Sequence, residues 1–291
     1  MGIVAVGLMV AMIAFISSIV QAGREGTAAS IAMQAAWTFG AATAALGILK
    51  TGIAVVLWGI VRRIWLRAES IKAALPKLMP PKADQPPLRE GAIDTSYGPA
   101  EVTRTPPAPL FIHRLSFALW APMLLMGVMG LGAGLILSFI EAGAASSQST
   151  GTFNSLRALV PGIMFFGEAL LLAGISFLLG SILGSIRQGG GEVQESVGVH
   201  VKTLKMPLTA KLFVALMMMG MMVEMAQLGL YIYAATLENA ESLDVWLTWL
   251  GPLREAGLGL LLSGIVLALA SIGKVLGFQF SRIQELIAVG R

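Results

Sequence analysis

The sequence predicts an all-α integral membrane protein with six transmembrane helices that form three antiparallel hairpins. The first observation is composition: 56% of the 291 residues are hydrophobic and only 12% are charged, with a mean hydropathy of +0.80. Ordinary soluble domains carry about 25% charged residues. The second and third observations are six long apolar segments and an uneven distribution of lysine and arginine among the connections that join these segments. This composition argues against a soluble enzyme, a disordered chain or a nucleic-acid-binding module, although the pI is 9.6.

Each predicted span is a continuous apolar segment of about 20 residues or more, which is the length that crosses a bilayer as a helix. The six spans are 2–21, 38–61, 115–140, 158–185, 210–236 and 247–276. Continuous apolar sequence favours helices over the alternating strands of a membrane barrel. The first segment lacks the basic start of a signal peptide, so we expect it to stay in the protein as a helix.

The connections between the spans divide the chain into five predicted regions. They are a first hairpin with a cytoplasmic helical extension (1–75), a proline-rich cytoplasmic loop (76–112), a second hairpin (113–187), a cytoplasmic loop (188–209) and a third hairpin with a cytoplasmic tail (210–291). Residues 76–109 contain nine of the 13 prolines, a density that prevents helix formation. The proline-rich loop is either a disordered linker or a docking strap for a partner subunit.

Three shorter segments of the cytoplasmic regions carry their own predictions. The stretch 62–78 is basic and amphipathic, so it should continue the second helix beyond the membrane. The glycine run at 189–193 predicts a flexible turn rather than a phosphate-binding loop, because no Lys-Ser or Lys-Thr pair follows it. The weak alternation of 197–202 predicts a short strand.

Lysine and arginine predict the orientation of the chain, because cytoplasmic connections carry an excess of these residues. Nine lie in 62–114, four in 187–211 and three at the C-terminal end, which places 16 on one side. Only three lie toward the other side: Arg24, Arg157 and Arg254. Both termini and the two long loops are therefore predicted to be cytoplasmic, and the bias favours a bacterial cytoplasmic (inner) membrane.

The three hairpins resemble one another, which predicts an internal repeat. Their second spans share a leucine followed closely by a Gly-Ile pair, at 49–53, 172–175 and 262–265. Each of these spans then runs to a basic end, at Arg62, Arg187 and Arg282. Three similar hairpins would place equivalent residues at similar depths in the membrane.

Ionisable side chains inside apolar spans are costly, so each one indicates a structural or functional site. Lys50 and Glu224 lie 12 and 13 residues from the basic ends of their spans, which puts both about 18–20 Å deep. We therefore predict a Lys50–Glu224 ion pair, or a shared polar cavity, near the middle of the membrane. Gln227 lies one turn beyond Glu224, and Glu168 lies nearer the outer face. The pair is either a fastener between helices or part of a proton or ion pathway.

Two further sets of residues have predicted contacts. Arg62, Arg63 and Arg67 follow the second span, where they would meet anionic lipid head groups. Glycines spaced four apart favour close helix packing in membranes, either within the chain or with neighbouring chains. These glycines are Gly130 and Gly134, Gly180 and Gly184, and Gly273 and Gly277.

The remaining chemistry of the sequence points away from catalysis and cofactors. The chain has no cysteine and only two histidines, His113 and His200, both in predicted cytoplasmic segments. No catalytic set, metal cluster or haem-ligating histidine pair is predicted. The leading hypothesis is a non-catalytic structural or anchoring subunit without a redox cofactor, whose partners are other membrane subunits and lipids but not nucleic acid. The alternative is a small-solute or ion transporter or channel with a polar site around Lys50 and Glu224.

Overall fold

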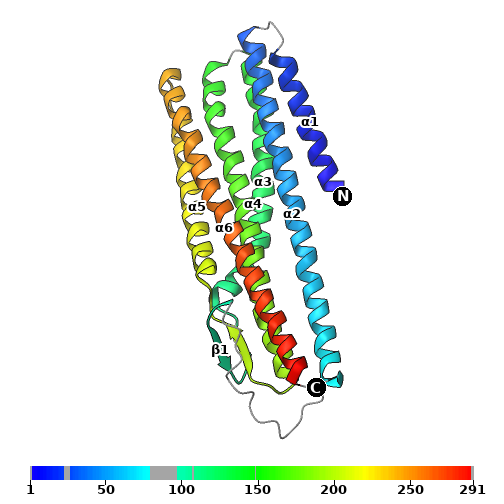
Figure 1. Cartoon of the computed structure of the whole chain (residues 1–291). Coiled ribbons are helices and arrows are strands. Elements are labelled where there is room, and N and C mark those ends of the chain that lie inside the picture. The colour runs from blue at the N-terminus through cyan, green and yellow to red at the C-terminus, as the bar shows by residue number, and fades with distance from the viewer. Residues whose placement is uncertain (1, 23–26, 79–96, 107, 148, 290–291) are drawn as a thin grey trace. The chain divides into compact units, whose positions relative to one another are not determined.

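The computed structural model describes residues 2–22, 27–78, 97–106, 108–147 and 149–289 of the chain. These ranges form six α-helices and two short β-strands (Figure 1). The helices are α1 (Gly2–Ala22), α2 (Ala28–Leu78), α3 (Phe111–Ser146), α4 (Thr150–Ser196), α5 (Leu208–Ala234) and α6 (Ala240–Val289). The strands are β1 (Ala100–Thr103) and β2 (Val201–Leu204). The prediction of an all-α protein is confirmed, with one short β-ribbon added to it.

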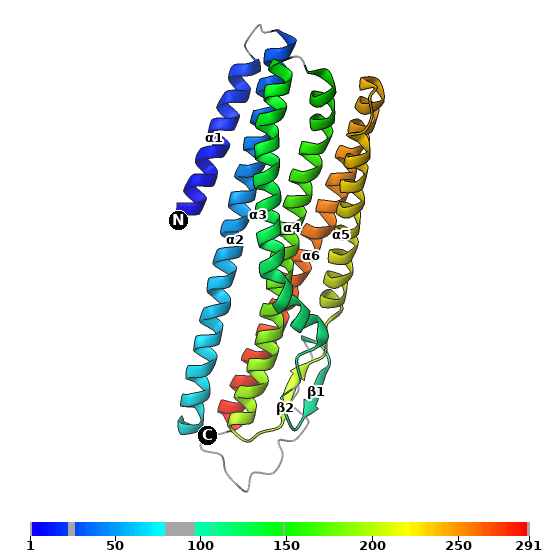
Figure 2. The same cartoon turned by 180° about the vertical axis from the view of Figure 1, so that it is seen from behind.

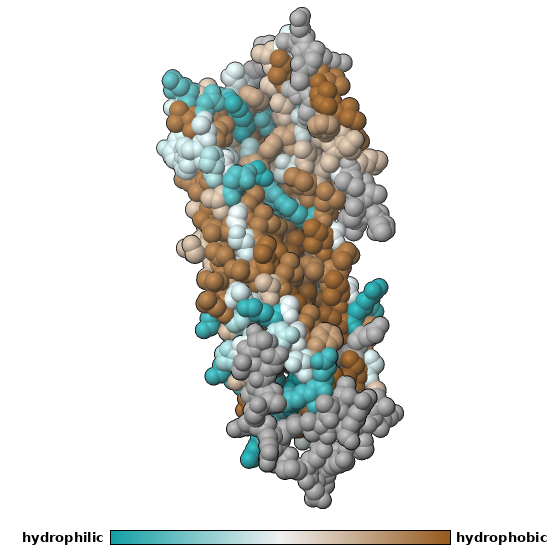
Figure 3. Space-filling view, viewed as in Figure 1, coloured by the Kyte–Doolittle hydropathy of each residue, from teal (hydrophilic) through white to brown (hydrophobic). Residues whose placement is uncertain are grey.

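Five helices, α2 to α6, are long and apolar enough to cross a membrane, judged by length and composition within the described residues. Large apolar side chains on these helices are exposed: Leu125, Met129 and Ile136 of α3 are 62–64% exposed. Figure 3 shows hydrophobic residues, in brown, along the middle of the helices and hydrophilic residues, in teal, toward their ends. This surface is compatible with a lipid environment. The predicted first span forms a helix, α1, but is not one of these five.

Three helices are longer than the spans that hydropathy predicts. Helices α2, α4 and α6 contain 51, 47 and 50 residues, which corresponds to about 70–77 Å at 1.5 Å per residue. The hydrocarbon core of a bilayer is only about 30 Å thick. Hydropathy marks the apolar part of each helix and leaves its polar extension unmarked. The predicted continuation of the second helix through residue 78 is present.

The turn predicted at 189–193 is wrong, because α4 continues through this glycine run to Ser196. A Cβ atom added at Gly190 would overlap the amide group of Gln279 in α6. Close packing on α6 therefore outweighs the intrinsic helix penalty of glycine, which is about 1 kcal/mol per residue. The chain turns after α4 instead, where Gly198 has a φ of 71°, a left-handed conformation that favours glycine.

The contacts of the chain define two compact units. Unit 1 comprises Met1–Val55, Trp120–Ile175 and Leu216–Leu262, and unit 2 comprises Val56–Leu119, Ser176–Ala215 and Ser263–Arg291. Helices α2 to α6 each contribute residues to both units. The division therefore crosses these helices and does not follow the three predicted hairpins.

Helix α4 provides the core of unit 1. The most apolar 18-residue segment of α4 is 83% buried, whereas the corresponding segments of the other four apolar helices are 22–33% buried. Val160, Met164 and Leu171 of α4 are fully buried and pack in one apolar cluster with Leu131 of α3. Most residues of this segment are buried, so a charged side chain within it needs partners from the protein itself.

Glycines allow α3 and α4 to approach closely in unit 1. A Cβ atom added at Gly130 of α3 would lie 3.1 Å from the Cα atom of Gly167 in α4. One added at Gly134 would lie 3.4 Å from the Cβ atom of Met164. Backbone contact of this kind is what small residues provide between membrane helices.

In unit 2 only part of the predicted glycine packing is observed. Added Cβ atoms at Gly180 and Gly184 of α4 would lie 2.7 Å from Ser116 Oγ and from His113 Cγ of α3, respectively. Among the described residues, nothing lies within 4 Å of a Cβ atom added at Gly273. The close packing predicted at Gly273 is therefore not formed within the described part of the chain, and packing on a neighbouring chain stays a prediction. Gly277 contacts the ring of Tyr97, which precedes β1, rather than a neighbouring helix.

The two strands form an antiparallel ribbon in unit 2, with Ala100 opposite Leu204 and Thr103 opposite Val201 (Figure 2). All four side chains of β2 are buried. The strand predicted at 197–202 starts later, at Val201, because the preceding residues turn away from the end of α4. Its partner β1 lies within the predicted proline-rich loop, where the sequence showed no strand. Residues 79–96 of that loop lie outside the described part of the chain.

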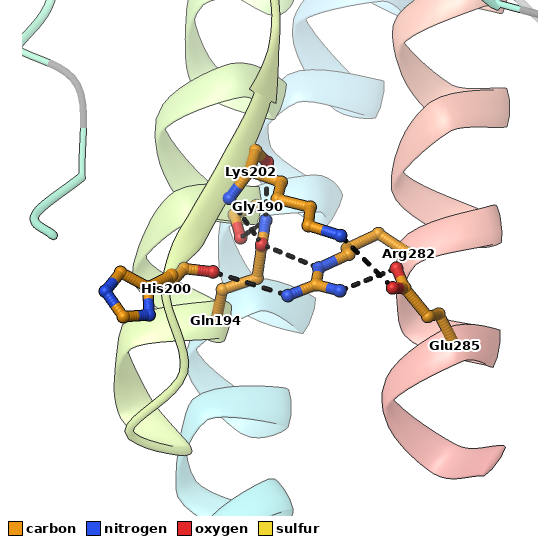
Figure 4. A network of polar contacts seen from close by, with 6 residues as sticks. All are labelled: Gly190, Gln194, His200, Lys202, Arg282 and Glu285. Atoms are coloured by element: carbon orange, nitrogen blue, oxygen red, sulfur yellow. Dashed lines mark hydrogen bonds and ion pairs between the residues drawn. The ribbon is translucent and has the colours of Figure 1, made fainter. Parts of the chain in front are cut away.

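A buried arginine attaches the ribbon to two helices of unit 2 (Figure 4). Arg282 of α6 is only 3% exposed. Its guanidinium donates to Gln194 Oε1 at 3.1 Å, to Glu285 at 2.6 Å and to the His200 carbonyl at 3.3 Å. Lys202 of β2 donates its backbone N–H to Gln194 Oε1 at 2.9 Å, and its Nζ lies 3.2 Å from Glu285. The network holds β2 against α4 and α6.

Candidate functional site

Glu168 of α4 joins two cationic side chains from different helices in unit 1. Lys50 of α2 forms an ion pair with its Oε1 atom, and Arg254 Nη2 of α6 lies 2.9 Å from its Oε2 atom. Glu168 itself is only 3% exposed. A buried carboxylate needs such compensation, because removing it from water is expensive. One carboxylate therefore links three helices.

Arg254 is held by α4 at two points. Its guanidinium carbon lies 3.8 Å from the centre of the Phe165 ring, one helical turn before Glu168. An arginine over an aromatic face gains a cation–π attraction in addition to its ion pair. The Nε atom of Arg254 is buried and has no hydrogen-bond partner among the described residues. The side chain is thus fixed in place without using all of its donors.

The direct Lys50–Glu224 ion pair predicted from depth is not formed, because Lys50 pairs with Glu168. Depth was counted along each helix, and this count carries no information about which way the helix faces. Glu224 nevertheless lies against Gly257 of α6, one helical turn beyond Arg254. The predicted residues therefore belong to one charged cluster, with a different pairing inside it.

Glu224 and Gln227 of α5 are the least satisfied members of this cluster. Both are only 1% exposed. Among the described residues, neither carboxylate oxygen of Glu224 has a hydrogen-bond partner, and the same is true of Gln227 Oε1. Gln227 Nε2 donates a long bond of 3.4 Å to the Leu250 carbonyl. Leaving a buried polar group unpaired costs about 1–3 kcal/mol, and more for a charged one.

A glycine of α6 provides the space that Glu224 occupies. A Cβ atom added at Gly257 would lie 2.9 Å from Glu224 Cδ and 3.2 Å from Glu224 Cγ. Any larger residue at position 257 would therefore displace the carboxylate. The carboxylate of Glu224 can occupy this position because the facing residue, Gly257, has no side chain.

Arg254 is the site residue that sequence reasoning missed, because it was placed at the outer edge of the last predicted span, 247–276. Helix α6 begins at Ala240, so Arg254 is already about 21 Å along the helix. The available signal was Asn239, whose Oδ1 accepts the Glu241 N–H at 2.9 Å. Asparagine at this position is a common N-cap. Recognising it would have moved the helix start back to Ala240 and placed Arg254 about four turns inside the helix, rather than at its outer edge.

The predicted lipid-contacting arginines lie on the part of α2 that belongs to unit 2. Arg62 and Arg63 are exposed. Only the backbone of Arg67 is described, so its predicted contact lies outside the described side chains. Arg63 lines a cavity between α2, α4 and α6, whereas Arg62 does not line it.

Comparison of the chain with protein-family models, curated proteins and solved structures finds no match. The cluster in unit 1 must therefore be interpreted from its own chemistry. It contains two acids and two bases from four helices, with one acid fully paired and the other unpaired. Such an arrangement can bind and release a proton at the unpaired acid while the paired acid keeps the helices together.

Proposed function

We propose that the chain is a multi-pass membrane protein that moves protons through unit 1, with Glu224 as the proton-binding group. The observation that carries this proposal is a fully buried carboxylate without a hydrogen-bond donor, next to a second carboxylate that holds two cations. Burial without a donor disfavours the ionised form of a carboxylate. Ionisable groups inside membrane spans commonly form proton relays.

The proposed topology places the charged cluster between the two sides of the membrane. Six spans would form three antiparallel hairpins with both termini in the cytoplasm of a bacterium. The support for this arrangement is the excess of lysine and arginine on one side, 16 against three. Glu224 would then lie near the middle of the membrane, within reach of both sides through motions of the surrounding helices.

Lys50 supplies the proposed switch. When Glu224 carries a proton, Lys50 remains on Glu168, as observed. When Glu224 releases the proton, a second buried carboxylate appears in the cluster, and it would attract Lys50 because opposite charges interact strongly where water is excluded. Arg254 still neutralises Glu168 after Lys50 leaves. Proton release is thereby coupled to the movement of one side chain between two acids on different helices.

Proton flux in vesicles tests this proposal. The purified chain would be reconstituted into liposomes that contain a pH-sensitive dye, and an imposed potential would drive protons. Glu224→Gln should reduce the flux at least tenfold, because an amide cannot take up the proton. Glu238→Gln, at an exposed position beyond the end of α5, is the matched control and should keep the flux. Full flux in Glu224→Gln would refute the assignment of Glu224.

An anchoring subunit of a larger membrane complex, without a redox cofactor of its own, is the second candidate. The observation that favours it is an exposed methionine face on α5, where Met218, Met219, Met222 and Met225 are 53–67% exposed. Methionine is frequent at adaptable interfaces. Purification in a mild detergent followed by mass spectrometry would test it. A stoichiometric partner together with absent proton flux would favour the anchoring role, and a lone chain or a homo-oligomer would refute it.

A further inference from the structure

Unit 2 contains a cavity of about 800 Å³ between α2, α4 and α6. Its lining comes from residues 60–72 of α2, 185–194 of α4 and 276–283 of α6. This volume lies within the range of about 300–1,000 Å³ that is typical of small-molecule sites. None of the residues of the charged cluster in unit 1 contributes to it, so the cavity requires its own explanation.

The walls of the cavity are mainly apolar. Ile60 and Ile64 of α2, Ile186 of α4, and Leu276 and Ile283 of α6 line it. A cavity with these side chains favours a hydrocarbon chain over a polar metabolite, because the ligand must lose its contacts with water. The apolar walls therefore indicate an aliphatic part in the ligand.

The cavity begins where three predicted spans end. Those spans end at residues 61, 185 and 276, and the lining starts at residues 60, 185 and 276. In a membrane this position corresponds to the head-group region on the side with the excess of positive charge. A ligand at this depth would be amphipathic, with its chain in the apolar part and its polar end near water.

The polar groups of the lining favour a negatively charged ligand. Lys72 is paired with Glu69 and Glu192, and Arg282 is paired with Glu285. Arg63 also lines the cavity and forms no ion pair among the described residues. It is thus the cation that remains for a ligand.

Gln279 adds an unused hydrogen-bond donor to the wall. It lines the cavity and is only 8% exposed. Its Nε2 atom has no acceptor among the described residues. The glycine at position 190 makes room for this amide, which explains why a glycine run occupies a helix here. A rotation of the amide would allow it to donate to a carbonyl oxygen of a ligand.

From these features we infer that the cavity of unit 2 binds an anionic membrane phospholipid. One acyl chain lies against the isoleucine-rich wall, the phosphate meets Arg63, and an ester carbonyl accepts a hydrogen bond from Gln279. Basic pockets between membrane helices at the cytoplasmic side are known to hold such head groups. The inference requires unit 2 to sit at a membrane surface but does not depend on proton movement at Glu224.

Native mass spectrometry of the full chain in detergent tests the inference. Phosphatidylglycerol and phosphatidylcholine with identical acyl chains would be added in turn. We expect phosphatidylglycerol to bind at least tenfold more tightly. Arg63→Gln should abolish this preference, whereas Arg114→Gln, at an exposed arginine of α3 outside the cavity, should keep it. Equal binding of the two lipids, or equal effects of the two substitutions, would overturn the inference.

A second pair of variants tests whether the lipid binds inside the cavity or on the outer surface of the protein. Ile64→Trp fills the cavity and should reduce phosphatidylglycerol binding at least fivefold. Val56→Trp, at an exposed position of the same helix outside the lining, should not. Thermal unfolding of each variant would establish that it is folded. Undiminished lipid binding in a folded Ile64→Trp variant would place the lipid elsewhere on the protein.

Discussion

Glu168 is shared by Lys50 and Arg254, so energetic coupling in the cluster should follow these contacts. We expect Lys50→Met to couple to Glu168→Gln by about 0.5–3 kcal/mol, the usual range for residues in one network. Coupling of Lys50→Met to Glu224→Gln should be weaker, because no ion pair joins the two residues. Double-mutant cycles, followed by thermal unfolding in detergent, measure both coupling energies. The opposite order would support the pair predicted from depth.

The space around Glu224 provides a second test by single substitutions. Gly257→Ala should displace the carboxylate, lower the melting temperature and reduce proton flux, because the new Cβ atom would lie 2.9 Å from Glu224 Cδ. Gly259→Ala in the same helix is the control, since nothing lies within 4 Å of a Cβ atom there among the described residues. The control should be neutral or slightly stabilising, as alanine favours helix. Equal behaviour of the two variants would contradict the packing.

The members of the cluster were more predictable than their pairing. Lys50, Glu168 and Glu224 are evident from sequence because a charge within an apolar run is rare. Their partners depend on helix rotation, which hydropathy does not report, because the apolar surface extends around most of each helix. Arg254 follows Gly251-Pro252, a pair that resembles the end of a connection. The helix N-cap at Asn239 shows how far inside α6 it lies.

Packing between α3 and α4 carries a prediction at the level of the element. Gly130→Leu should separate the helices, because the added side chain would meet the backbone of Gly167. We expect a loss of several degrees in melting temperature, since about 1 kcal/mol corresponds to roughly 2–4 °C at a comparable chain length. Gly132→Leu, which has open space around it within the described structure, should leave the melting temperature nearly unchanged. Equal loss in both variants would argue against close packing at Gly130.

The helices were predicted where the apolar sequence is continuous. Structure was missed where packing against a neighbouring element determines the backbone conformation. The apolar runs of α2 to α6 are all present as helices. The glycine run of α4 has a poor intrinsic helix propensity and remains helical because the neighbouring α6 packs on it. Strand β1 has only four residues and pairs with a segment about 100 positions away. Local sequence cannot specify such a distant partner.

The orientation of the whole chain can be tested by labelling. The sequence contains no cysteine, so single cysteines can be introduced without a background signal. Lys205 and Thr236 are both exposed and lie in connections predicted to face opposite sides. A membrane-impermeant maleimide added to intact cells should label Thr236→Cys, and it should label Lys205→Cys only after the membrane is opened. Labelling of both in intact cells would contradict the proposed topology.

The sharing of Glu168 also has a consequence for how the nascent chain matures. Lys50 is synthesised before Glu168, but Arg254 follows 86 residues later. At about 5–20 residues per second, the second cation emerges about 4–17 seconds after the acid. During this interval the acid has one partner instead of two. A ribosome that stops after α5 would release a fragment in which Glu168 keeps Lys50 but lacks the ion pair that ties it to α6, and such a fragment should be a preferred substrate for membrane proteases.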